Sequence, residues 1–241
     1  MKFILFFALL LGSFSGLASP LPDFPFVTAT GQSSKQVAPD SATVSFSITT
    51  FHQSAEVANA QLSQASTAVL ALLKANGVSD GQITAYELEK SAKRKRDDNY
   101  NELDILGYDF NRRFEIRLNT LKQYPALLAQ LYAAEYVHNL NSVFDTSERD
   151  AVETALISAA AAQARKKAEQ MAEGLGVKIH SVFAFNDSGS FNSFFATFGV
   201  SDSTLVLAEV SASRTGSAQQ VLVPQFIEIA KTVNVIYKIT P

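Results

Sequence analysis

Hydrophobic and polar residues alternate in several short segments of the chain, with the period of two that is typical of half-buried strands. In the runs 42–50 and 108–118, apolar side chains occupy nearly every even position and polar side chains the odd ones. We expect the polar face of this sheet to meet water. Further strands are predicted at 83–88, 140–144, 179–185 and 227–239. In the last of these, Lys231 indicates a bulge, an edge strand or a paired charge.

Three other segments have apolar residues spaced three and four positions apart, which predicts amphipathic helices. The first helix is expected from Ser54, as N-cap, to Gly77, and a short second helix starts at Pro125. The third is predicted from Ser147 to Gly176, with a near-match to a capping box at its start and many alanines that permit close packing. The order β-α-β-β-α-β-α-β-β predicts an α+β fold, with antiparallel or mixed sheets and helices packed on one face.

Residues 1–18 have the layout of a secretory signal peptide. Lys2 supplies positive charge, an apolar run continues to Leu11, and small residues follow. This run is shorter than the about 20 apolar residues that a membrane-spanning helix needs. We therefore expect cleavage between Ala18 and Ser19 and a mature chain in the periplasm. No later segment is long and apolar enough to span a bilayer, so we expect no transmembrane span in the mature chain.

The mature chain is expected to begin with an extended leader. Residues 19–30 contain three prolines, which fix the backbone and remove hydrogen-bond donors. Regular structure is expected after Gly31. Residues 31–241 then form the α+β region, as one domain or as two subdomains.

Composition excludes several classes of function. The formal net charge of −3 gives no reason to expect a nucleic-acid-binding protein, since such proteins carry a strongly basic face. Without cysteine, the chain has no disulfide, thiolate metal site or cysteine nucleophile. The histidines share no metal-ligand spacing with one another or with carboxylates; they are His52, His138 and His180. No nucleotide-binding loop, nucleophile elbow or zinc-protease motif is present. We expect a protein without metal or cofactor that is not an enzyme.

A run of four basic residues lies between two predicted strands and is therefore expected in a hairpin loop. Two aspartates follow it directly. The run is interpreted either as a solvated loop or as a contact with anionic lipid headgroups or an acidic partner. Its residues are Lys93, Arg94, Lys95 and Arg96.

Residues 186–220 are rich in serine, glycine and threonine and hold four phenylalanines without regular spacing. Exposed aromatic rings are costly, so this loop is expected either to fold onto its own core or to bury its rings against another subunit, a ligand or a membrane surface. The alternative function is a module that binds a small molecule, lipid or peptide under this loop. The rings are Phe191, Phe194, Phe195 and Phe198.

Several short motifs together cover almost the whole mature chain. Gly31 and the pair Pro39 and Asp40 precede an alternating strand, and the end of the long helix reads A-R-x-K-A-E-x-x-A-x-x-L-G. By these motifs the sequence resembles the SIMPL-domain family of exported bacterial proteins, which includes periplasmic immunogens and proteins linked to oxidative-stress tolerance. The helix positions that carry the resemblance are Ala164, Arg165, Lys167, Ala168, Glu169 and Gly176.

The resemblance implies a protein of the cell envelope with no catalytic residues to assign. Its small motif residues permit close packing, while the charged ones pair along the helix or brace the sheet. The chain departs from the family at Gln225, where glycine is usual. One relative assembles into a large channel-like ring, so a homo-oligomer is expected here, in a structural or interaction role that supports oxidative-stress tolerance.

Overall fold

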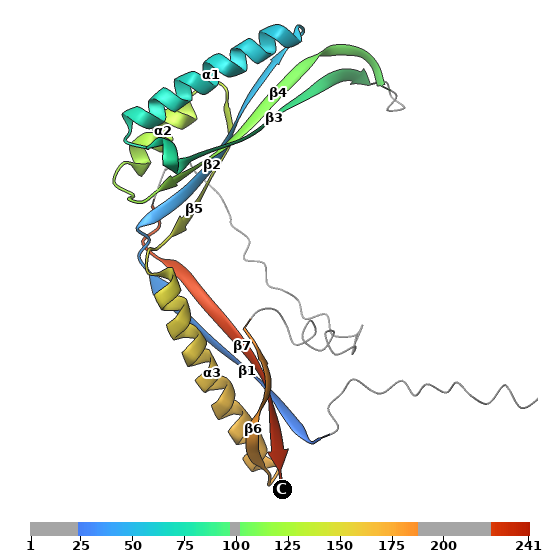
Figure 1. The fold of residues 1–241 in the computed structure, drawn as a ribbon, viewed down its shortest axis with the longest axis vertical. Coiled ribbons are helices and arrows are strands. Elements are labelled where there is room, and N and C mark those ends of the chain that lie inside the picture. The colour runs from blue at the N-terminus through green and yellow to red at the C-terminus, as the bar shows by residue number, and fades with distance from the viewer. Residues whose placement is uncertain (1–23, 97–101, 188–222) are drawn as a thin grey trace, which may run out of the picture. The chain divides into compact units, whose positions relative to one another are not determined.

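The structure, a computed structural model, describes residues 24–96, 102–187 and 223–241. These residues form an α+β fold, as predicted, in which helices and strands are interspersed along the chain (Figure 1). The elements are β1 (Phe26–Val37), β2 (Ser41–His52), α1 (Ala55–Ala75), the 3₁₀ turn η1 (Asp80–Gln82), β3 (Ile83–Arg96), β4 (Glu102–Leu118), α2 (Tyr124–Ala133), β5 (Val137–Asp145), α3 (Arg149–Gly174), β6 (Lys178–Asn186) and β7 (Ile227–Thr240).

Strand β1 corrects the expectation that regular structure starts after Gly31. The strand begins at Phe26, inside the segment expected to be an extended leader. The sequence of β1 shows little alternation of apolar and polar residues. The strand pairs with β7 at the other end of the chain, and beside it the N–H of Ile239 donates to the carbonyl of Pro25 at 3.1 Å. Strand β1 is thus fixed by a distant partner that local pattern does not show.

The strands form two sheets, of orders β1-β7-β6 and β3-β4-β2-β5. The pairs β2–β4, β2–β5, β3–β4 and β6–β7 are antiparallel. The chain divides into two compact units, one around each sheet, and the boundaries within the described residues fall in β1, α3 and β7. Because β7 lies between β1 and β6, Lys231 does not mark an edge strand.

The four-stranded unit has the larger core. Helices α1 and α2 cover one face of the sheet, where even-numbered residues of β2 and β4 point inward. The rings of Phe46 and Phe114 stack there with centroids 5.4 Å apart. Helix α2 adds Leu127, Leu128 and Leu131, which are fully buried. The other face carries the polar odd-numbered residues, as the alternation predicted.

The three-stranded unit is built around the alanine face of α3. Ala160, Ala164 and Ala168 are completely buried against β1 and β7. A Cβ atom at Gly31 would lie 1.9 Å from the carbonyl oxygen of Ala160 and 2.6 Å from the nitrogen of Ala164. Strand β1 therefore crosses α3 at a distance that only glycine permits.

Candidate functional site

The open face of the four-stranded sheet brings together polar residues from separate segments of the chain. Pairing places Ser45 opposite Glu115, Ser47 opposite Arg113, and Thr49 opposite Asn111. Directly paired residues point to the same face, so hydroxyls and amides from β2 and β4 form one continuous patch.

A bulge in the β2–β5 pairing opens this face into a cavity. The register shifts between Ser45 and Ser47, and Asn139 on β5 takes a left-handed conformation with φ of 54°. Asparagine tolerates this conformation better than most residues. Its side-chain amide donates to the Ser47 hydroxyl at 3.2 Å, and that hydroxyl donates to the carbonyl of His138 at 3.4 Å. The cavity of about 210 Å³ is lined by Ser45, Phe46, Ser47, Asn111, Arg113 and Asn139.

One cation and two carboxylates lie in or beside this cavity. Arg113 is more than half exposed, lies 3.8 Å from a Glu115 oxygen, and stacks its guanidinium over the Tyr86 ring at 4.8 Å. The Tyr86 hydroxyl donates to Glu115 at 3.4 Å. The Asn111 amide accepts from Thr49 at 3.1 Å and donates to Glu89 at 3.2 Å. The carboxylates are thus held by their neighbours, while the guanidinium keeps donors that face solvent.

Sequence reasoning predicted the polar face and missed the cavity. Alternation along 108–118 placed Asn111 and Arg113 on the side that meets water. Nothing in the local pattern of β5 showed that Asn139 would form a bulge, because a bulge is defined by the register with the partner strand. Asn139 lies one residue before the strand predicted at 140–144, and an asparagine at that boundary was a weak local signal, because this residue tolerates positive φ.

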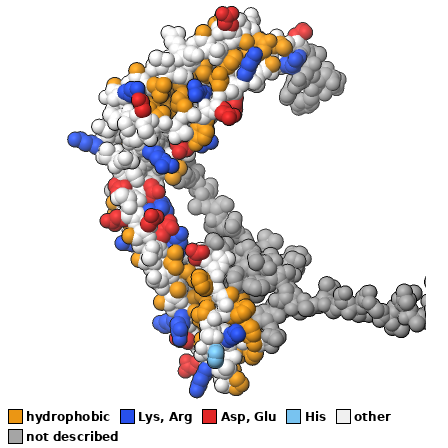
Figure 2. All heavy atoms as spheres, viewed as in Figure 1, with side chains coloured by type: hydrophobic (Ala, Val, Ile, Leu, Met, Phe, Trp, Pro, Cys, Tyr) orange, Lys and Arg blue, Asp and Glu red, His pale blue; other side chains and the backbone are white. Residues whose placement is uncertain are grey.

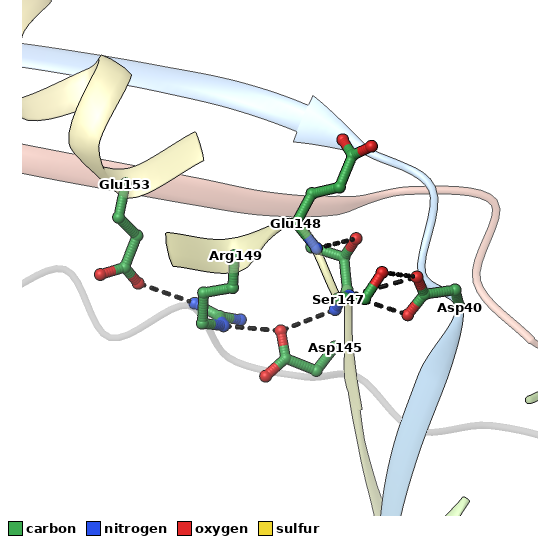
Figure 3. Close-up of polar contacts among 7 residues, drawn as sticks. Asp40, Asp145, Ser147, Glu148, Arg149 and Glu153 are labelled. Atoms are coloured by element: carbon green, nitrogen blue, oxygen red, sulfur yellow. Dashed lines mark hydrogen bonds and ion pairs between the residues drawn. The ribbon is translucent and has the colours of Figure 1, made fainter. Parts of the chain in front are cut away.

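Asp40, a motif residue, lies in a polar cluster with the segment before α3 (Figure 3). Its carboxylate accepts the Ser147 N–H at 2.9 and 3.1 Å from its two oxygens, and also accepts the Ser147 hydroxyl. The hydrogen bond from the Ser147 side chain holds the pKa of Asp40 below its ordinary value. The Asp40 N–H donates to the carbonyl of Asp145 at 3.0 Å. The hydroxyl of Ser147, the first residue of the near-match to a capping box, donates to Asp40.

Arg149, the first residue of α3, ties the same segment to the helix. Its Nε donates to Asp145 at 2.6 Å and its Nη1 to Glu153 at 3.1 Å (Figure 3). The hydrogen bond to Asp145, followed by that to Glu153, raises the pKa of Arg149. The charged groups of this cluster are hydrogen-bonded to one another or to Ser147, so we interpret the cluster as structural.

The charged motif residues of α3 serve the same purpose in the three-stranded unit. Arg165 and Glu169 pair at 2.8 Å, one turn apart on the exposed side. Lys167 donates to the carbonyl of Thr30 on β1 at 3.3 Å, which braces the sheet.

A hollow of about 410 Å³ lies where α3 ends and β6 begins, and the Arg165–Glu169 pair occupies part of its wall. Gly176 there has φ of 72°, which suits the end of a helix.

The basic run is part of a strand, which corrects the expectation of a hairpin loop. Lys93 pairs with Gly107 and Arg94 with Ile105, so β3 continues to Arg96 along β4. The long partner strand supplies hydrogen bonds that the sequence of β3 alone does not reveal. The Lys93 ammonium lies 5.2 Å from the centre of the Phe51 ring, and Lys95 is exposed.

The four phenylalanines at 191, 194, 195 and 198 lie outside the described residues, and so does most of the loop 186–220. The strand that leads into this loop exposes apolar side chains of its own. Phe185 is 72% exposed and Val182 50% exposed. Figure 2 shows hydrophobic side chains gathered at the end of the unit where β6 lies. Nearby, the Lys238 ammonium lies 4.2 Å from the centre of the Phe24 ring.

The histidines are not brought together. His52 accepts the N–H of Ser54 at 2.9 Å at the start of α1, and His180 contacts the Ser181 hydroxyl at 3.0 Å. His138 contributes its backbone carbonyl to the bulge. Within the described ranges, no three residues of the metal-binding types form a cluster. No helix in these ranges is long and apolar enough to cross a membrane.

In comparisons with known proteins, the chain is similar to a protein family and to a relative. The profile of the SIMPL family, described as a protein of unknown function (DUF541), matches residues 27–237. The chain is also 24% identical over 235 residues to the uncharacterized protein YggE of Edwardsiella ictaluri, covering 92% of this chain and 90% of that protein. The family profile runs from β1 to β7 and so spans both sheets and the three helices of the described residues.

Proposed function

The chain belongs to the SIMPL family, and we propose that it is an exported, non-enzymatic protein of the bacterial cell envelope that self-associates in a structural or interaction role. The observation that carries this proposal is the contrast between the edge strands of its sheets. Each edge strand has one hydrogen-bonded neighbour among the described residues, and such an edge adds a further strand readily.

The edge strands differ in how well they are protected from pairing with another chain. Strand β3 carries a row of basic side chains, and charge on an edge opposes pairing with another chain. Strand β6 has no charged residue from Ser181 to Asn186, and it exposes Val182 and Phe185. Exposed apolar side chains on such an edge strand favour burial against a second copy. The contact between copies is therefore proposed at β6.

Light scattering coupled to size exclusion, at several protein concentrations, tests this assembly. We expect a defined mass above that of one chain, and a lower mass after Val182→Lys or Phe185→Lys. Val143→Lys is the matched control, because Val143 is 55% exposed on the other sheet's edge strand β5. A single-chain mass at every concentration, or an equal loss of mass in all three variants, would count against assembly through β6.

The export part of the proposal rests on the signal-peptide layout of residues 1–18. Protein purified from a periplasmic fraction is expected to begin at Ser19, and intact-mass measurement gives this directly. Recovery of a chain that begins at Met1 would contradict it.

A role in oxidative-stress tolerance is proposed as an indirect one. The chain has no cysteine and only two methionines, one of them the initiator, so it offers few groups that an oxidant would consume. A strain lacking the protein is expected to regain peroxide survival with the wild-type gene and not with the Phe185→Lys gene. Full rescue by that variant would separate the stress role from assembly.

Binding of a small molecule, lipid or peptide is the second candidate function. The observation that favours it is the polar cavity beside Asn139, on a sheet face that no helix covers among the described residues. A ligand that binds the folded protein raises its melting temperature, so a thermal-shift screen is the first test.

A further inference from the structure

The cavity beside Asn139 has hydrogen-bonding capacity that its surroundings do not use. Ser47 and Asn111 are engaged by neighbouring groups. The Ser45 hydroxyl has no hydrogen-bond partner within the described part of the chain. The carbonyl oxygen of the Asn139 side chain accepts no hydrogen bond there either, since only its amide nitrogen is bonded, to Ser47. The cavity therefore offers a hydroxyl and an amide to a ligand.

Arg113 supplies the charge of the cavity. Its distance of 3.8 Å to Glu115 makes a loose ion pair, longer than a charge-assisted hydrogen bond. The Tyr86 ring, 4.8 Å away, supports one side of the guanidinium. A guanidinium has five N–H donors in one plane, and two of them can bind the two oxygens of a carboxylate at the same time. The guanidinium is thus held beside Tyr86 and Glu115, and Arg113 is the one cation among the residues that line the cavity.

We propose that this cavity binds the carboxylate of a small ligand or of a chain end, with Arg113 as the ion partner and with Ser45 and Asn139 holding the adjacent polar group. The nearby carboxylates of Glu115 and Glu89 oppose a second negative charge, so a singly charged carboxylate fits better than a phosphate dianion. About 210 Å³ is less than the roughly 300 Å³ at which drug-sized pockets begin, which suits a small group. The inference is independent of the assembly proposed above.

The probes are N-acetylglycine and its neutral analogue N-acetylglycinamide, added to the ¹⁵N-labelled protein. We expect N-acetylglycine to shift the Arg113 Nε–H and Asn139 side-chain resonances in a saturable way, and the neutral analogue to leave them unchanged. Inorganic phosphate is expected to bind more weakly than N-acetylglycine.

Variants locate the site. Arg113→Gln is expected to weaken N-acetylglycine binding by about tenfold or more, because it removes a charge-assisted contact. Asn139→Gly introduces a residue that tolerates positive φ and removes the side-chain amide with its methylene, so it is expected to weaken binding less. Arg117→Gln is the matched control, since Arg117 lies four residues further along β4, on the same face and outside the cavity.

Three outcomes would overturn the proposal. They are an absence of saturable shifts with N-acetylglycine, equal binding of the neutral analogue, and an equal loss of binding in Arg113→Gln and Arg117→Gln. Tighter binding of phosphate than of N-acetylglycine would also contradict the proposal, because it would show that the site prefers a different anion. Oligomer mass measured on the same variants keeps this test separate from assembly, because none of the changed residues lies on β6.

Discussion

The carboxylate of Asp40 holds Ser147, a residue 107 positions further along the chain, through bonds to both its backbone N–H and its hydroxyl. Asp40 directly precedes β2, and Ser147 lies between β5 and α3. One short side chain thus joins the start of β2 to the start of α3.

Replacing Asp40 by Asn is expected to lower the melting temperature at pH 7. The folded-state pKa of Asp40 lies below its ordinary value of 3.8, so its contribution to stability is full above that value and is lost as pH falls through the folded-state pKa. Thermal melts from pH 7 to pH 2.5 should therefore show the difference between wild type and variant shrinking at the acid end. Asp109→Asn, on the open face of β4, is the control. A difference that stays constant over this pH range would refute the ionic role.

Gly31→Ala is expected to destabilise the protein by about 1–3 kcal/mol, the usual cost of forcing an extra methyl group into a packed site. The added Cβ would meet the α3 backbone at Ala160 and Ala164. Gly174→Ala on the same helix has open space around its Cβ, and is expected to be neutral or stabilising by up to about 1 kcal/mol. Urea unfolding of both variants measures the contrast. Equal stability of the two would show that α3 and β1 are not in close contact.

Phe114→Ala is expected to cost about 3–5 kcal/mol, because it leaves a cavity in a fully buried ring stack with Phe46. Phe51→Ala should cost less, since that ring is 44% exposed at the end of β2. Chemical denaturation compares the two directly. A larger loss for Phe51 would place the core of this unit elsewhere.

The burial of Tyr237 in the three-stranded unit can be tested at alkaline pH. Burial raises its pKa above 10.0, so its contribution to stability is present below that value and is lost as pH rises through the folded-state pKa. Stability of the wild type should fall between about pH 10 and pH 12 more steeply than that of Tyr237→Phe. Tyr132→Phe is the control, because Tyr132 is 63% exposed. Absorbance near 295 nm follows the ionisation itself, and an unshifted titration in a Tyr132→Phe background would contradict burial.

Local pattern in the sequence was sufficient for most of the elements. The alternation at 42–50 and 108–118 predicted β2 and β4, because the side-chain period of a strand is a property of the strand alone. The spacing of leucines and alanines predicted the three helices for the same reason. The alanine positions of α3 also predicted close packing, since small side chains permit it whatever the partner is.

Partners distant in the chain decided the rest. Strand β1 exists because β7 pairs with it, the basic run is strand because β4 extends alongside it, and the division into two sheets follows from which strands pair. The cavity beside Asn139 depends on the register of β5 against β2, and the Asp40–Ser147 contact depends on two loops meeting across 107 residues. Sequence by itself determined the helices, most of the strands and their buried faces, since these depend on neighbours within a few positions. Tertiary structure alone determined pairing, register and the polar cavity, because hydrogen bonds between remote segments leave no periodic trace in either segment.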